Sequence, residues 1–169
     1  MITHGILMRW AQGSGGELGQ VTIQANGLGC VCGNRGCPEA LASGIVIQRR
    51  GHGVAVEQKL IGEDVTRLAR EGDKAALSVL QEVGRWLGIG LAGFVNAFNP
   101  EVVAIASGVA KVGELILEAT RARCLQLQLR SPTRDLVEVM EATPGPGSGV
   151  LGAAAIARIP PSGEYVLGT

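Results

Sequence analysis

The feature that most constrains the fold is a long helical pattern that stops abruptly before an apolar run. From Asp73 to about Ala97, apolar residues recur every three or four positions, which predicts one long amphipathic helix. The pair Asn99-Pro100 ends this pattern. Residues 101–108, EVVAIASG, contain a continuous apolar run, VVAIA, and end in glycine, as is typical of a buried parallel strand. A long helix that leads directly into such a strand predicts an α/β fold.

The remaining residues divide into shorter elements of both kinds. The predicted strands are 2–8, 21–24 and 135–142, and the predicted helices are 38–50, 62–71, 112–129 and 150–159. Strand, helix and strand follow one another after residue 101, so we expect parallel pairing between residues near 101–107 and 135–141. Cys124 is expected to be a small core residue. Gly84, Gly88, Gly90 and Gly93, all inside the long helix, predict close packing against another helix.

Composition excludes several classes of function. The 169 residues carry 15 basic and 15 acidic side chains, so no basic surface favours nucleic acid or an anionic membrane. No segment approaches the roughly 18 consecutive apolar residues of a spanning helix, and the first residues do not form a signal peptide. Four cysteines are too few for a disulfide scaffold and indicate reduced thiols. We therefore expect a globular cytoplasmic protein without nucleic-acid or membrane partners.

Three of the four cysteines form a tight C-x-C-x4-C motif, Cys30, Cys32 and Cys37, with glycines between them. Three thiolates this close can hold one Zn²⁺ ion, which prefers sulfur ligands in tetrahedral geometry. Spacing alone leaves two interpretations open: a structural zinc site completed by a fourth ligand, and three reduced thiols without a metal. A disulfide between Cys30 and Cys32 is not expected, because residues two apart have poor geometry for the bridge.

Two acidic residues, Glu17 and Glu39, flank the cysteine motif. Carboxylate oxygens accept hydrogen bonds from hydroxyl groups and therefore suit a polyol ligand. Each acid also has a simpler interpretation. Glu39 lies where an acid favours the start of a helix, and Glu17 lies in a loop open to solvent. Neither residue by itself identifies a ligand.

The whole segment from residue 15 to residue 44 resembles the ROK family of sugar kinases and repressors. The similarity rests on GGELGQ, then CVCGNRGCPEA, then ASG, where the family has E-[IL]-G-H followed by C-x-C-G-x-x-G-C-x-E. It continues through the FNP stop and a late GxLGAA-type segment, over about residues 2–158. The resemblance implies an actin-like or ribonuclease-H-like ATPase lobe at 1–159, with a mixed sheet flanked by helices and a cysteine knuckle, and a flexible tail at 160–169.

The resemblance also implies roles for individual residues. Glu17, Gln20 and Glu39 would bind sugar hydroxyls, and the three cysteines would hold a structural zinc ion. The turn at Ser107 and Gly108 would lie beside the nucleotide. Gln20 departs from the family pattern, which has a histidine that serves both the metal and the sugar. A glutamine amide is a poor zinc ligand, although it can still bond a sugar hydroxyl.

A sugar kinase of this family also needs an N-terminal lobe, which the sequence does not contain. The D-x-G-x-T phosphate loop, the second phosphate loop and the catalytic aspartate are all missing from it. We therefore expect no catalytic residue in this chain, no activity from the chain alone, and binding of ATP and Mg²⁺ only in a complete two-lobed protein. The abrupt opening strand is consistent with a truncated frame, an expressed lobe, or a split protein with a separately encoded N-terminal lobe.

Three functions stay open at this stage. The first is the sugar-binding lobe of an ATP-dependent hexose kinase of the glucokinase type. The second is a non-catalytic sugar-binding remnant, or the effector-binding part of a ROK-type repressor. The third is an assembly domain, because apolar helices rich in small residues suit a homo-oligomer, a dimer or larger.

Overall fold

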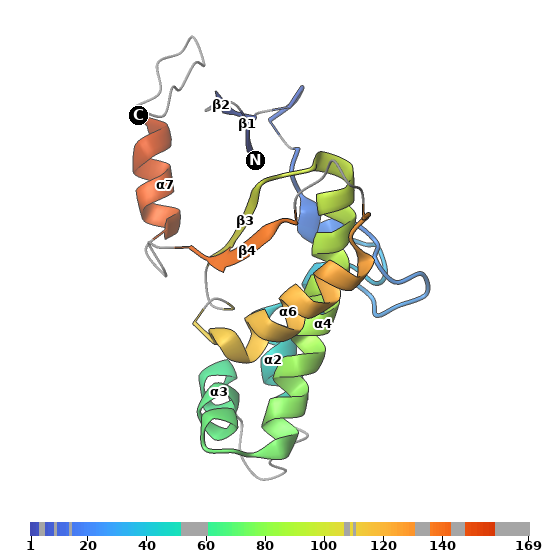
Figure 1. Cartoon of the computed structure of the whole chain (residues 1–169), viewed down its shortest axis with the longest axis vertical. Coiled ribbons are helices and arrows are strands. Elements are labelled where there is room, and N and C mark those ends of the chain that lie inside the picture. The colour runs from blue at the N-terminus through green and yellow to red at the C-terminus, as the bar shows by residue number, and fades with distance from the viewer. Residues whose placement is uncertain are drawn as a thin grey trace.

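The protein is rich in helices, and its longest two helices lie side by side through the middle of the molecule (Figure 1). The structure is a computed structural model that describes residues 1–3, 6–8, 10–13, 15–51, 61–106, 109, 111–130, 136–142 and 148–157. The described helices are η1 (Leu18–Gln20), α1 (Pro38–Ala42), α2 (Gly44–Gly51), α3 (Gly62–Arg70), α4 (Lys74–Phe98), α6 (Glu114–Leu127) and α7 (Ser148–Ala157). The strands are β1 (Ile2–Thr3), β2 (Ile6–Leu7), β3 (Val102–Ile105) and β4 (Glu138–Glu141).

Helix α4 begins and ends where the sequence predicts. Asp73 caps its first turn, because the Asp73 Oδ1 atom accepts a hydrogen bond of 2.8 Å from the Ala76 backbone N–H. Asn99 ends the helix in the left-handed conformation, with a φ of 47°, directly before Pro100. Neither α4 nor any other described helix is both long and apolar enough to cross a membrane.

Helix α6 packs closely against α4 because α4 presents glycines to it. A Cβ atom built on Gly84 would lie 2.6 Å from the Ile116 carbonyl oxygen, and one on Gly88 would lie 2.6 Å from that of Thr120. The expected role in close packing is therefore confirmed for these two glycines. It is wrong for Gly93, which has no neighbour within 4 Å and is exposed.

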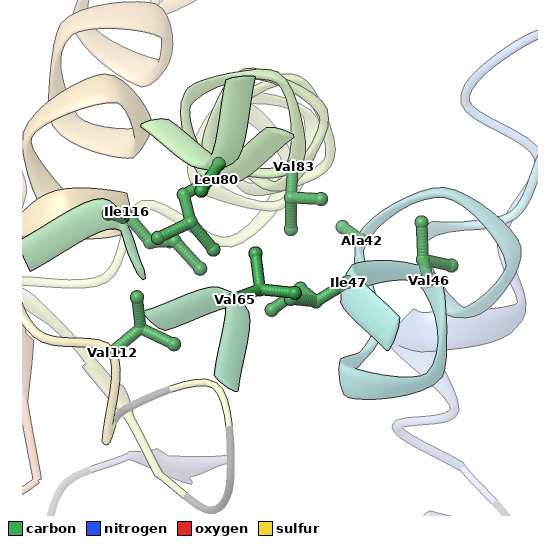
Figure 2. Close-up of a cluster of buried hydrophobic side chains, with 10 residues drawn as sticks. Ala42, Val46, Ile47, Val65, Leu80, Val83, Val112 and Ile116 are labelled. Atoms are coloured by element: carbon green, nitrogen blue, oxygen red, sulfur yellow. The ribbon is translucent and has the colours of Figure 1, made fainter. Parts of the chain in front are cut away.

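The main hydrophobic core joins five helices, α1, α2, α3, α4 and α6 (Figure 2). Leu80 and Val83 of α4 meet Val65 of α3, Ile47 of α2 and Ile116 of α6, and all five side chains are buried. Burying a side chain of this size stabilises the fold by about 1.5–3 kcal/mol. A second cluster, which includes Cys124 as predicted, connects α4 and α6 to the β3–β4 sheet.

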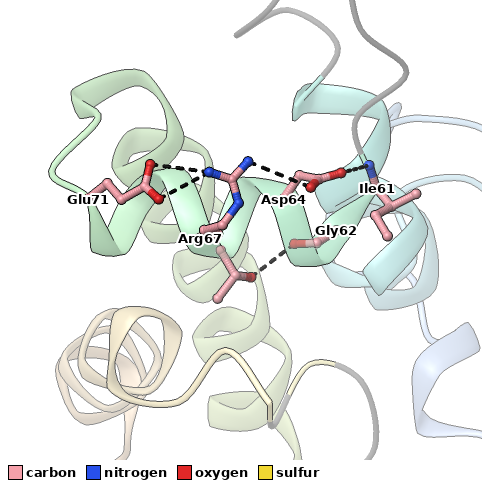
Figure 3. Close-up of polar contacts among 6 residues, drawn as sticks. Ile61, Gly62, Asp64, Arg67 and Glu71 are labelled. Atoms are coloured by element: carbon pink, nitrogen blue, oxygen red, sulfur yellow. Dashed lines mark hydrogen bonds and ion pairs between the residues drawn. The ribbon is translucent and has the colours of Figure 1, made fainter.

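Polar contacts along α3 and at its two ends stabilise the helix itself (Figure 3). The Ile61 backbone N–H donates to Asp64 Oδ2 at 3.0 Å, which satisfies one of the free donors at the start of the helix. One turn later, Arg67 donates to Glu71 Oε1 at 3.1 Å across the exposed face. Acids in the first turn of α3 and arginines in its last are therefore arranged as the sequence indicates.

The predicted parallel pairing is confirmed, but the single mixed sheet is not. Strands β3 and β4 pair in parallel with Val103 opposite Val139, while β1 and β2 form a separate antiparallel pair among the described residues. The expected burial of the strand after Pro100 is only half right. Val103 packs toward α4, whereas Val102 on the other face of β3 is 46% exposed, because no described element covers that face.

Three other predicted elements differ from the structure. The sequence predicts one strand over residues 2–8, yet the described residues form two short strands, β1 and β2, that pair antiparallel. Residues 21–24 form no strand, because the N–H groups of Ile23 and Gln24 both bond the Gly36 carbonyl oxygen and not a neighbouring strand. The predicted helix 38–50 is interrupted at Ser43, whose extended backbone separates α1 from α2.

The second end of the molecule is more open. Helix α7 lies apart from the α4–α6 pair, beyond the β3–β4 sheet (Figure 1). Two of its apolar side chains are exposed to solvent, Val150 at 76% and Leu151 at 59%. The predicted tail 160–169 lies outside the described residues.

Candidate functional site

The cysteine motif is held in a tight turn by backbone hydrogen bonds. The Cys30 N–H donates to the Asn34 carbonyl oxygen at 2.8 Å, and the Gly36 N–H donates to that of Leu28 at 2.7 Å. Gly36 has a φ of 65°, and a Cβ atom there would lie 1.9 Å from the Gln24 carbonyl oxygen. Only glycine fits this position, so the turn depends on a residue without a side chain.

The three thiols of this turn, called the cysteine cluster below, converge on one point. The Sγ atoms of Cys30, Cys32 and Cys37 all lie within 4.8 Å of one another, and those of Cys32 and Cys37 are 3.7 Å apart. In a tetrahedral site with Zn–S bonds of about 2.3 Å, neighbouring sulfur atoms are about 3.8 Å apart. The donor atoms therefore fit a zinc ion, and all four cysteines of the chain are free of disulfides.

The surroundings of these thiols separate their acidities. Hydrogen bonds, first from the Asn34 backbone N–H and then from Cys30, lower the pKa of the Cys32 thiol. Burial of Cys37, which is 0% exposed, raises the pKa of that thiol to about 12, and its bonds with Cys32 and Cys30 raise it further in the same direction. Cys32 therefore ionises before Cys37, and a bound cation would favour the thiolate form of both.

The polar residues predicted to bind substrate gather around η1, next to the cysteine cluster. Gln20 Nε2 donates to Glu17 Oε2 at 3.4 Å. Glu39, from the first turn of α1, lies against Gly19, with its Oε2 atom 3.8 Å from where a Cβ atom of that glycine would be. All three polar side chains are exposed, so their oxygen and nitrogen atoms are available to a ligand.

A cleft of about 550 Å³ opens beside these residues. Glu39 and Gly19 line one end of it, α1 and α2 form a wall, and Leu87 and Val109 line the rest. Helix α1 is fixed at this cleft because Pro38 packs on α4 at Gly90, where a Cβ atom would lie 3.3 Å from Pro38 Cγ. The cleft therefore extends from Glu39, a predicted sugar ligand, to Val109, which directly follows the predicted nucleotide turn.

A second cleft, of about 530 Å³, lies between α2, α3 and residues 111–112. Gly44 lines both clefts, so the two meet at the start of α2. Its rim is charged: Lys111 Nζ lies 3.4 Å from Glu63 Oε1, and Arg70 donates to the Lys111 carbonyl oxygen at 3.3 Å. Such a rim offers cationic groups to an anionic ligand beside an apolar wall.

The sequence does not predict this second cleft, because its residues come from segments up to about seventy positions apart. Lys111 gives the one local signal, since it follows the predicted turn at Ser107 and Gly108 by three positions. That turn and the two histidines, His4 and His52, lie outside the described residues. The structure thus brings together the predicted sugar ligands and the predicted metal ligands.

Known proteins are similar to this chain both in sequence and in fold. The model of the ROK family matches residues 1–159. A glucokinase from Thermotoga maritima is 34% identical over 94% of this chain and 54% of its own length. The xylose repressor of Bacillus subtilis is 32% identical over 92% of this chain and 40% of its own length.

Among solved structures, the fold is similar to that of a ROK family glucokinase from Streptomyces griseus in complex with glucose and AMPPNP. The TM-score is 0.81 at 29% identity, covering 89% of this chain and 54% of that one. The chain therefore spans about half the length of the glucokinases it matches, and less of the repressor.

Proposed function

The chain belongs to the ROK family, as its cysteine motif predicts, and from this premise we propose that it is the sugar-binding lobe of an ATP-dependent hexose kinase of the glucokinase type. The observation that carries the proposal is the grouping of Glu17, Gln20 and Glu39 around η1, at the edge of the cleft that extends to Val109. Carboxylate and amide oxygens accept hydrogen bonds from sugar hydroxyls, and the amide also donates one.

In this proposal each part of the lobe has a separate task. Glu17, Gln20 and Glu39 orient the hexose by its hydroxyls, while the second cleft and the turn at Ser107 and Gly108 receive the nucleotide. The shared wall at the start of α2 would keep sugar and nucleotide next to each other, which is the arrangement that transfer of a γ-phosphoryl group requires.

The chain supplies no catalytic residue in this scheme. Transfer needs a base that takes the proton of the attacking sugar hydroxyl, together with loops that hold the phosphates and Mg²⁺. The sequence contains none of these motifs, so residues 1–159 would act with an N-terminal lobe that is encoded separately or belongs to a longer protein. We expect the isolated chain to bind hexose and not to phosphorylate it.

The cysteine cluster is proposed to hold a structural zinc ion, in keeping with the spacing of its sulfur atoms. When bound, the ion would cross-link the turn and so fix Cys37, which lies two positions before Glu39. Zinc would thus position a sugar ligand without taking part in the transfer. A reduced thiol cluster also favours the cytoplasm as the place of this protein.

A homo-oligomer is the proposed assembly. A groove of about 690 Å³ runs along α4 and α6, with Trp86, Ile89 and Leu115 among its apolar residues. Glutamates and arginines border it, namely Glu82, Arg85, Glu118 and Arg123. Since both signs of charge are present, the groove of a second copy is a complementary partner.

A second candidate is the effector-binding part of a ROK-type repressor. It is favoured by the xylose repressor, whose sequence matches 92% of this chain at an identity close to that of the glucokinase. Both candidates use the same sugar site, and they differ in whether a partner lobe makes the complex phosphorylate the sugar. A non-catalytic remnant would bind sugar, but it would neither support phosphorylation nor act in a repressor.

Sugar binding is tested by thermal unfolding of the full chain with millimolar glucose, mannose or N-acetylmannosamine. A ligand of the folded state raises the unfolding temperature, so one of these hexoses should raise it for the wild type. Glu17→Gln and Glu39→Gln should abolish the rise without lowering the unfolding temperature of the free protein. Glu101→Gln, which changes an exposed acid that lines neither cleft, is the matched control and should keep the rise. A rise that survives both site variants would contradict the proposal.

A further inference from the structure

The cysteine cluster has three protein ligands and, among the described residues, no fourth. No other cysteine, histidine or carboxylate joins the group of donor atoms that lie within 4.8 Å of one another. Glu17 and Glu39 are therefore not part of it, although both are close in the fold. Cys124 is buried between α4 and the β3–β4 sheet in the second core cluster and does not contribute either.

Gln20 borders the cysteine cluster, but it contacts the cluster with its backbone and not with its side chain. Its carbonyl oxygen lies 3.4 Å from Cys37 Sγ and 3.4 Å from Asn34 Nδ2. Its side chain bonds Glu17 on the sugar side, through Nε2. The Gln20 side chain therefore bonds the Glu17 carboxylate and supplies no ligand to the three sulfur atoms.

The remaining side of the cluster is not closed by apolar packing. Cys30 and Cys32 are only half-buried, and Val31 between them is 98% exposed. Cys30 and Cys32 are therefore accessible to small molecules from solution, whereas Cys37 is buried. Zn²⁺ takes four ligands in tetrahedral sites, and sites with three protein ligands leave the fourth position to a molecule from solution.

Resting on the proposed zinc site, we propose that a metal ion held by Cys30, Cys32 and Cys37 keeps an open fourth coordination position, which is available to a small imidazole or thiol from solution. The open position follows from Gln20, whose side chain serves the sugar ligand Glu17 instead. The site would bind its metal more weakly than a four-ligand site and would exchange it more readily.

The test uses Co²⁺ in place of zinc in the full chain, because cobalt in a thiolate site absorbs visible light and reports each change of ligand. Cobalt is first titrated into the wild type, and the complex is then titrated with imidazole. We expect a cobalt spectrum that changes with imidazole and saturates. Gln20→Ala should behave as the wild type does, since the side chain of Gln20 is not a ligand.

Gln20→His is the matched gain-of-ligand variant. Its imidazole group should close the fourth position, remove the response to added imidazole, and tighten cobalt binding in equilibrium dialysis by at least about tenfold. Replacing both His4 and His52 by alanine should leave the imidazole response of the wild type unchanged. Cys124→Ser should keep both the cobalt spectrum and the response.

The outcomes separate this inference from the proposed zinc site. If the wild type binds no cobalt, the zinc site itself is wrong. If cobalt binds but imidazole changes nothing, or if Gln20→Ala alters the spectrum before imidazole is added, the open position is wrong and the zinc site stands. A response that appears only in the variant without His4 and His52 would likewise overturn the inference, because one of these histidines would then fill the position.

Discussion

Gln20 serves two neighbouring sites through different parts of one residue. Its carbonyl oxygen accepts from Cys37 and Asn34 at the edge of the cysteine cluster, and its amide donates to Glu17. A histidine at this position could offer one ring nitrogen to each side. A glutamine side chain cannot serve both sides in this way. Its amide has one acceptor oxygen, and an amide is a poor ligand for zinc that is bound by thiolates. A single side chain thus decides whether the proposed metal site and the proposed sugar site can share a residue.

Glu82 provides a test of single-residue electrostatics away from the site. It pairs with Arg50, which joins α4 to α2, and the hydrogen bond from Arg50 holds the pKa of the Glu82 carboxyl below its ordinary value of 4.5. Both side chains are partly exposed, so Glu82→Gln should lower the free energy of unfolding at neutral pH by at most about 1 kcal/mol.

The pH dependence of this difference follows from the direction of the shift. A carboxyl whose pKa is lowered by folding stabilises the protein above its unfolded pKa, and the contribution is lost as the pH falls through the lower, folded pKa. The wild type and Glu82→Gln should therefore converge below about pH 4.5. Urea unfolding across an acidic pH series measures this, with Glu101→Gln as control. A difference that grows toward acid would contradict the ion pair.

The pair of helices α4 and α6 is joined by glycine contacts and by one buried hydroxyl. Thr120 is fully buried, and its Oγ1 donates to the Ile116 carbonyl oxygen at 2.9 Å or to that of Gly84, on the other helix, at 3.2 Å. A hydroxyl buried at a contact this close needs such acceptors, because an unpaired one costs about 1–3 kcal/mol. The glycines of α4 and Thr120 of α6 therefore both contribute to the close contact between the two helices.

Two glycine substitutions in α4 should have opposite signs. Gly84→Ala should destabilise the protein by about 1–3 kcal/mol, because the new Cβ meets the Ile116 carbonyl oxygen at 2.6 Å in a tightly packed contact. Gly93→Ala should stabilise it by up to about 1 kcal/mol, because alanine favours the helix and the position is open. Chemical unfolding of the two variants measures both. Equal effects would show that the α4–α6 contact does not depend on glycine.

At the scale of the whole molecule, one end is a packed helical core and the other is open. The core around Leu80 carries the walls of both clefts, since α1, α2 and α3 all contribute residues to it. Beyond the β3–β4 sheet, Val102, Val150 and Leu151 are exposed. The walls of both clefts therefore rest on the main hydrophobic core, which suits a site that must hold its ligands in fixed geometry.

The proposed dimer is tested through the groove between α4 and α6. Sedimentation of the wild type at micromolar concentration should give a dimer or a larger assembly. Arg85→Glu combined with Arg123→Glu should give a monomer, because all four charges at the rim would then be negative. Lys74→Glu reverses an exposed charge on the same helix outside the groove and should leave the assembly intact. A monomeric wild type would contradict the proposal.

The order of the main elements and the family could be predicted from the sequence. The helical spacing after Asp73, the stop at Asn99 and the C-x-C-x4-C motif depend on neighbours within a few positions, so they can be recognised without a structure. The same holds for the parallel pairing of β3 and β4, which the helix between them dictates.

The tertiary structure decided what depends on segments far apart in the chain. Residues 21–24 look like a strand, but the Gly36 carbonyl oxygen takes their N–H groups. Gly84 and Gly93 look alike in sequence, and only the position of α6 distinguishes them. The two clefts were likewise set by packing. Local patterns determine elements because backbone preferences act over a few residues, whereas a site is made where distant elements meet.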